Sequence, residues 1–259
     1  MVYHLAAMIT LARENETAWR VNTEGVRVVA EAARAAGVRR MVHCSSLHAF
    51  DHRQCCGLVD ENSPRAVVAE LPVYNRSKLA GEQEFCNSVE RGLDGVIVNP
   101  TGIVGPVDYG PSRLNRVLLM AARGRLPLGI GGGFDLVDVR DVALGLRAAA
   151  ERGRTGENYL IAGHFVEFMD ALRLAAKLNG RRGPRWAFPQ SMLGKFKRNA
   201  LIGPTVDMLT SPRVDGSKAR RELGHQPRPI AETISDLVAS FRASGRMRAA
   251  VTEGASRWV

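Results

Sequence analysis

Short apolar runs alternate with amphipathic stretches along this chain of 259 residues. The runs at 2–6, 40–44 and 95–99 have the length and apolar character of buried strands. Apolar residues recur at helical spacing over 16–36, where Gly37 ends the helix, and again in a helix that begins near Tyr74. This alternation of strands and helices predicts an α/β protein built on a parallel sheet.

The second half of the chain continues the alternation less regularly. It contains predicted helices at 112–123, before 152, at 166–178 and at 231–243, and predicted strands before Asp138 and at 157–162. With 45% hydrophobic residues, a chain of this length can bury one full core beside a smaller lobe. We therefore expect a core at 1–163, with 124–163 partly in the lobe, a substrate-binding lobe at 164–245, and a loose tail at 246–259.

The main candidate for chemistry is the segment that starts at Tyr74. Lys78 follows Tyr74 by four residues, so the two side chains are neighbours on one helix face and the ammonium can favour the phenolate. This predicts Tyr74 as a general acid or base whose pKa Lys78 lowers. Ser46 follows a strand-like run and is expected to open into the ligand crevice, where its hydroxyl can bond a substrate oxygen.

These residues belong to a series of segments that resembles an extended short-chain dehydrogenase/reductase, of the epimerase/dehydratase and dihydroflavonol-reductase-like group. The similar segments are, in order, Val2–Ala7, Arg20–Gly25, Val42–Ser46, Tyr74–Lys78, Val98–Pro106, Asp138–Ala143 and Val214–Gly224. The resemblance extends from residue 2 to about residue 243. It implies a Rossmann-like, doubly wound parallel sheet with a small C-terminal substrate-binding lobe, and NAD or NADP as the cofactor.

The resemblance also implies individual roles. Tyr74 would transfer the proton, Lys78 would lower its pKa and bind the nicotinamide ribose, and Ser46 would orient the substrate oxygen. Ser45 is the alternative to Ser46 and a cofactor contact. Asn22 would support a proton relay, or it is a polar residue on a solvated helix face. The remaining implied cofactor contacts are Ala6, Ala7, Asn99 and Pro100, although Asn-Pro before a glycine is also a common loop sequence.

The family begins with a glycine-rich turn that binds the cofactor pyrophosphate at a helix N-terminus. No such turn follows an opening strand here, and the glycines of 129–133 precede a strand instead of opening a helix. We therefore expect an N-terminally truncated form of the fold, from a start codon placed too far downstream or from a cloned fragment. A genuine short form is the alternative, and it would leave the strand at 2–6 as an exposed sheet edge.

The implied reaction interconverts a ketone and a secondary alcohol on a small neutral or apolar molecule. Nucleotide-sugar epimerases of this family carry arginines that bind the diphosphate, but Phe134 and 206–209 occupy those positions here, with Arg213 as a partial substitute. A nucleotide-sugar epimerase/dehydratase is therefore the second interpretation. A non-catalytic Rossmann-like binding module is the third, because fold alone does not establish activity.

The charge and the cysteine content of the chain do not point to a further function. The formal net charge is +10, but the basic residues are spread along the sequence and aromatic residues are only 6%, so specific nucleic-acid binding is not expected. No run approaches the roughly 18–20 apolar residues of a membrane span, which favours a cytoplasmic protein without membrane contact. The four cysteines suggest neither a disulfide framework nor a metal site. The resemblance implies a homodimer formed through helices 16–36 and 74–91.

Overall fold

The computed structural model describes residues 1–55, 57–110, 112–188 and 212–247. Its strands are β1 Val2–His4, β2 Met41–Cys44, β3 Leu58–Val59, β4 Gly95–Pro100, β5 Gly102–Val104, β6 Leu128–Ile130, β7 Gly133–Asp138, β8 Asn158–Ile161, β9 His164–Glu167, β10 Trp186–Phe188 and β11 Arg213–Val214. Its helices are α1 Glu16–Asn22, α2 Glu24–Ala35, η1 Leu47–Ala49, α3 Val73–Glu90, α4 Arg113–Ala122, α5 Val139–Arg152, α6 Phe168–Leu178, the π-helix η3 Ala219–Leu223 and α9 Ile230–Ala243.

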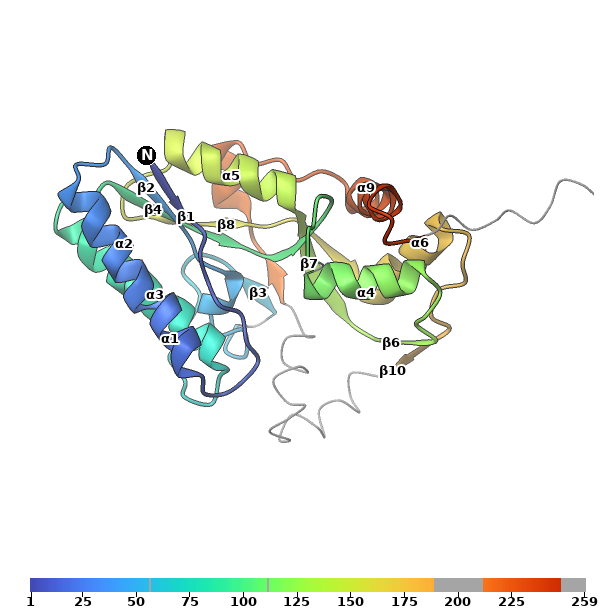
Figure 1. Ribbon diagram of the computed structural model, residues 1–259. Coiled ribbons are helices and arrows are strands. Elements are labelled where there is room, and N and C mark those ends of the chain that lie inside the picture. Colours follow the sequence, from blue (N-terminus) through green and yellow to red (C-terminus); the bar gives the residue numbers. More distant parts are fainter. Residues whose placement is uncertain (56, 111, 189–211, 248–259) are drawn as a thin grey trace, which may run out of the picture.

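A parallel sheet forms the first layer, with strand order β1-β2-β4-β8. Helices α1, α2 and α3 cover one face of this sheet, and α5 covers the other (Figure 1). Val42, Val96 and Val98 of the sheet pack with α5 residues such as Val142 in one buried cluster. The predicted Rossmann-like, doubly wound α/β fold is therefore confirmed.

A second core lies beside the sheet and forms the lobe. Its three-stranded sheet has the order β5-β7-β9, with β7 and β9 antiparallel. Leu118 of α4, Leu172 of α6 and Leu237 of α9 are buried together against this sheet. The sequence prediction places the lobe at 164–245, with part of it at 124–163. The lobe core also includes α4, which lies before residue 124.

Helix 16–36 is not continuous, contrary to the sequence prediction. It breaks at Thr23 (φ −116°, ψ −72°), whose hydroxyl donates to the carbonyl of Trp19 at 2.8 Å and competes with the regular helical bond. The break separates α1 from α2. The sequence also does not predict strand β9, whose last two residues fall within the helix expected at 166–178.

Helix α3 lies unusually close to α1. A Cβ atom on Gly81 would come within 2.2 Å of the main-chain oxygen of Asn22, so only glycine allows this contact. The contact fixes α3, which carries Tyr74 and Lys78, against the helix that carries Asn22. Among the described residues, no helix is both long and apolar enough to cross a membrane.

Candidate active site

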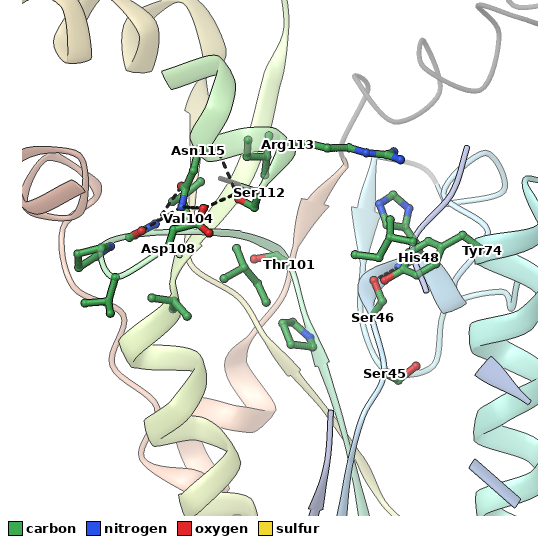
Figure 2. Close-up of a pocket in the computed structure, with 18 residues that line it drawn as sticks. Ser45, Ser46, His48, Tyr74, Thr101, Val104, Asp108, Ser112, Arg113 and Asn115 are labelled. Carbon is green, nitrogen blue, oxygen red and sulfur yellow. Dashed lines mark hydrogen bonds between the residues drawn. The ribbon is translucent and has the colours of Figure 1, made fainter. Parts of the chain in front are cut away.

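A cavity of about 600 Å³ opens between the carboxyl ends of the parallel strands and the lobe (Figure 2). This is where open α/β sheets bind their ligands. Its lining residues are Ile9, Ser45, Ser46, His48, Tyr74, Pro100, Thr101, Ile103, Val104, Gly105, Pro106, Val107, Asp108, Ser112, Arg113, Leu114, Asn115 and Val139. The cavity therefore brings Ser45, Ser46, Tyr74 and Pro100 together, four of the residues that the sequence predicted.

Tyr74 and Ser46 meet on the sheet side of the cavity. Tyr74 is the second residue of α3 and only 7% of its surface is exposed. Ser46 is the N-cap of η1, so its hydroxyl accepts a hydrogen bond from the His48 amide at 3.2 Å. Burial raises the pKa of the Tyr74 phenol to about 12, and a hydrogen bond with the Ser46 hydroxyl opposes that rise. The phenol is thus protonated at neutral pH.

The predicted lowering of the Tyr74 pKa by Lys78 is wrong for the protein described here. Lys78 is 3% exposed and its Nζ donates to the main-chain oxygen of Cys44 at 3.0 Å. Burial lowers the pKa of the Lys78 ammonium and raises that of the Tyr74 phenol. Removal of both groups from water therefore outweighs the attraction that their spacing suggested.

Asn22 is buried, which excludes the interpretation of a solvated helix face. Its exposed fraction is 1%, and its Nδ2 donates to the Ser77 hydroxyl at 3.0 Å and to the carbonyl of Met8 at 2.9 Å. Its Oδ1 accepts from the amide of Met8 at 2.8 Å. The side chain therefore fastens the segment after β1 to the start of α3, one turn from Tyr74.

Asn99 is fully buried and is not among the residues that line the cavity. Its Nδ2 donates to the main-chain oxygen of Ser46 at 3.0 Å and to Oε1 of Glu82 at 2.6 Å. Glu82 also forms an ion pair with Arg65, whose guanidinium lies over the ring of Phe50. This buried network holds the peptide of Ser46 in place.

Glu82 was missed in the sequence, although a signal was available. It follows Tyr74 by eight residues and Lys78 by four, so all three lie on one face of α3. A carboxylate on the buried face of a helix needs a partner, and its partners come from other segments.

The remaining predicted cofactor residues lie in two places. Ser45 lines the cavity, is 5% exposed, and its hydroxyl has no hydrogen-bond partner among the described residues. Such a group fits a polar part of a bound molecule, such as the nicotinamide cofactor that the resemblance implies. Ala6 and Ala7 are exposed on the segment after β1 and do not line the cavity.

His48 is a second residue of the site to which the sequence assigns no role of its own. Its ring packs edge-on to Tyr74 at 5.8 Å between centroids and contacts His52 at 5.4 Å. Burial lowers the pKa of His48 to about 3, with a smaller contribution from His52, so the imidazole is neutral. Its position two residues after Ser46 was the available signal.

The lobe side of the cavity is mainly apolar, with Ile103, Val104 and Pro106. Asn115 stiffens this wall, because its side chain accepts from the Gly105 amide at 3.2 Å and donates to the Gly105 carbonyl at 3.0 Å. Arg113 extends from α4 across the cavity mouth toward His48 (Figure 2). The described residues contain no group of His, Cys, Asp and Glu that could hold a metal ion.

Comparisons with known proteins agree with this arrangement. A model of the NAD dependent epimerase/dehydratase family matches residues 1–162. Sterol demethylase protein B of Methylococcus capsulatus is 32% identical over 94% of this chain and 79% of its own length. A putative dihydroflavonol 4-reductase of Synechocystis is 28% identical over 95% of this chain and 77% of its own.

Solved structures show the same fold. The crystal structure of gox2253 superposes with a TM-score of 0.85 and 32% identity, covering 95% of this chain and 80% of that one. The crystal structure of PA4631, a nucleoside-diphosphate-sugar epimerase from Pseudomonas aeruginosa, gives a TM-score of 0.74 and 26% identity. The match covers 88% of this chain and 76% of that one.

Proposed function

Because the chain belongs to the NAD-dependent epimerase/dehydratase family of extended short-chain dehydrogenases/reductases, we propose that it interconverts a ketone and a secondary alcohol on an apolar substrate. The family is NAD-dependent, so the predicted cofactor, NAD or NADP, is confirmed at the level of the family. When bound, the cofactor supplies the redox chemistry at the substrate carbon.

The observation that carries the proposal is the placement of the Tyr74 phenol and the Ser46 hydroxyl together beside an apolar cavity wall. In the reductive direction the protonated Tyr74 phenol donates its proton to the substrate oxygen, which the Ser46 hydroxyl orients. In the oxidative direction the same pair accepts the proton. The ammonium of Lys78, one turn away, would stabilise the phenolate once the proton has left.

The lining of the cavity supports an apolar substrate. The lobe wall presents aliphatic side chains, and His48 adds a neutral hydrogen-bonding group beside Tyr74. Phe134, which stands where nucleotide-sugar epimerases carry an arginine, packs against Phe168 in the lobe core at 4.9 Å between ring centroids. The names of two relatives, sterol demethylase protein B and a putative dihydroflavonol 4-reductase, are consistent with this class.

A nucleotide-sugar epimerase is the second candidate, favoured by the likeness to PA4631 and by Arg113 at the cavity mouth. The two candidates differ in the substrate they need. Oxidation of NADH or NADPH by a bulky cyclic ketone, with no conversion of UDP-glucose or GDP-mannose, supports the reductase. The reverse pattern supports the epimerase, and binding of nicotinamide cofactor without turnover of either would support a non-catalytic module.

Replacement of Tyr74 by phenylalanine tests the proton-transfer role. We expect turnover to fall by at least about a hundredfold, the usual contribution of a positioned acid or base, with cofactor binding retained. Tyr3→Phe is the matched control, because Tyr3 is 41% exposed on β1 and does not line the cavity. Full turnover in the Tyr74→Phe protein would remove Tyr74 from the mechanism.

We also propose that the chain forms a homodimer through α1, α2 and α3. Trp19 and Val28 expose 38% and 54% of their surfaces on α1 and α2, which supports a contact there. Light scattering at micromolar concentration tests this, and a mass of one chain would contradict it.

A further inference from the structure

Arginines that are distant in sequence gather at the end of the lobe that lies farthest from β1 and α2. Three segments meet there: 123–128 after α4, 179–188 after α6, and 242–247 at the end of α9 (Figure 1). They carry Arg123, Arg125, Arg181, Arg182, Arg185, Arg242 and Arg246 and contain no aspartate or glutamate. The fold therefore concentrates basic residues that appear dispersed along the sequence.

The positive charge of this end is not neutralised by carboxylates. Arg123 donates to the main-chain oxygen of Arg246, and Arg246 donates to those of Asp108 and Tyr109. Arg242 donates to the main-chain oxygen of Leu178 and to the side-chain Oδ1 of Asn179. Within the described part of the chain, no ion pair joins any of the seven arginines to an acidic side chain. These hydrogen bonds fix several guanidinium groups while leaving their charge available.

An exposed apolar strip lies next to the arginines, on the small sheet of β6 and β10. Trp186 pairs with Leu128 across the two strands and they expose 70% and 54% of their surfaces, while Phe188 exposes 40%. On the opposite face α6 covers β6 at Gly129, where a Cβ atom would lie 2.3 Å from the sulfur of Met169. The alternation of strand side chains therefore directs Trp186, Leu128 and Phe188 outward.

We propose that this basic and apolar end of the lobe binds the surface of an anionic lipid bilayer. Arginines attract anionic headgroups, while tryptophan and neighbouring apolar side chains insert at the boundary between headgroups and acyl chains. The exposed aliphatic side chain of Leu128 favours lipid over nucleic acid, because it gains free energy in the acyl region but cannot stack on a base. This is surface binding, distinct from a membrane span, and it is independent of the proposed reaction.

Vesicle sedimentation tests the proposal directly. The protein should bind vesicles of phosphatidylglycerol and phosphatidylcholine in equal parts more tightly than vesicles of phosphatidylcholine alone, and binding should weaken in about 1 M salt, where charges are screened within about 3 Å. The double change Arg181→Glu and Arg182→Glu should lower the affinity more than about tenfold, since each arginine near the surface contributes about fivefold. Equal binding to both kinds of vesicle would overturn the proposal.

The matched control is Arg39→Glu with Arg221→Glu, which changes the net charge equally on two exposed arginines outside this end of the lobe and outside helices α1, α2 and α3. It should leave vesicle binding within about twofold of the parent; an equal loss would show a general charge effect and refute the site. In a protein that retains Trp186 as its only tryptophan, fluorescence should shift to shorter wavelength with anionic vesicles. Absence of the shift, or binding of single-stranded DNA without any binding of vesicles, would also refute it.

Discussion

Replacing Glu82 with glutamine should destabilise the protein strongly while leaving the active site largely intact. The Glu82 side chain is 5% exposed and that of Arg65 28%, so the change leaves a mostly buried guanidinium without its carboxylate. Removing one partner of a buried ion pair costs about 3–5 kcal/mol, and the partial exposure of Arg65 reduces this to about 2–3 kcal/mol. For a chain of this size the melting temperature should fall by roughly 5–10 °C.

Glu82→Gln should lower turnover much less than it lowers stability. Glutamine keeps an oxygen that can accept from Asn99, which also holds the Ser46 carbonyl, so turnover should fall by less than about threefold. Glu82→Ala removes this acceptor, lets Asn99 and the Ser46 peptide shift, and should lower turnover by about tenfold or more.

The assays measure unfolding by denaturant and turnover of the substrate identified for the parent protein. Glu24→Gln is the matched control, because Glu24 is 55% exposed in a 3.5 Å pair with Arg20 and should change stability by less than about 1 kcal/mol. Adding Arg65→Met to Glu82→Gln should recover at least part of the loss, since it removes the uncompensated charge. If Glu82→Gln unfolds at the parent's denaturant concentration, the buried pair does not stabilise the fold and the reasoning is refuted.

Three further predictions concern packing and pH. Gly81→Ala should cost at least about 2 kcal/mol in urea unfolding, because its methyl group would overlap the Asn22 carbonyl, whereas Gly25→Ala, with 3.8 Å to its nearest neighbour, should be neutral or stabilising. The pKa of His48 is lower in the folded protein than in the unfolded chain, so on acidification the unfolded chain takes up a proton at this side chain first. The free energy of unfolding should therefore fall as the pH drops below about 6.5. His48→Gln should remove about 1–2 kcal/mol of the stability loss seen at pH 5. The raised pKa of Tyr74 affects stability at alkaline pH. The protonated phenol contributes fully to the free energy of unfolding below about pH 10, and this contribution is lost as the pH rises toward 12. The melting temperature of Tyr74→Phe should therefore fall less steeply with alkaline pH than that of the parent.

Local sequence patterns predicted the parts of the site that depend on local geometry. Tyr74 and Lys78 are one helical turn apart, and Ser46 follows a buried strand, so their approximate positions follow from spacing alone. The roles of Asn22 and Asn99 could not be predicted in the same way. Their partners Ser77 and Ser46 lie 55 and 53 residues away, and only the packed structure shows that both amides are used to fasten other segments.

The electrostatic predictions failed for a related reason. Spacing places Lys78 near Tyr74, but the pKa values depend on how much water the completed fold leaves around each group. Similarly, the arginines at 123–125, 179–185 and 242–246 are dispersed in sequence and become neighbours only when α4, α6 and α9 share one core.

The placement of Tyr74, Lys78 and Glu82 on one face of α3 limits how the chain can tolerate changes of length. Inserting one residue between Tyr74 and Glu82 would rotate one group by about 100° relative to the others, since a helix has about 3.6 residues per turn. The loop over 51–64 is less restricted, because the bridge between Phe50 and Arg65 joins its two ends, although β3 within it pairs with β11. Related proteins can therefore vary the parts of this loop outside β3 in length, at a small entropic cost, without moving Tyr74.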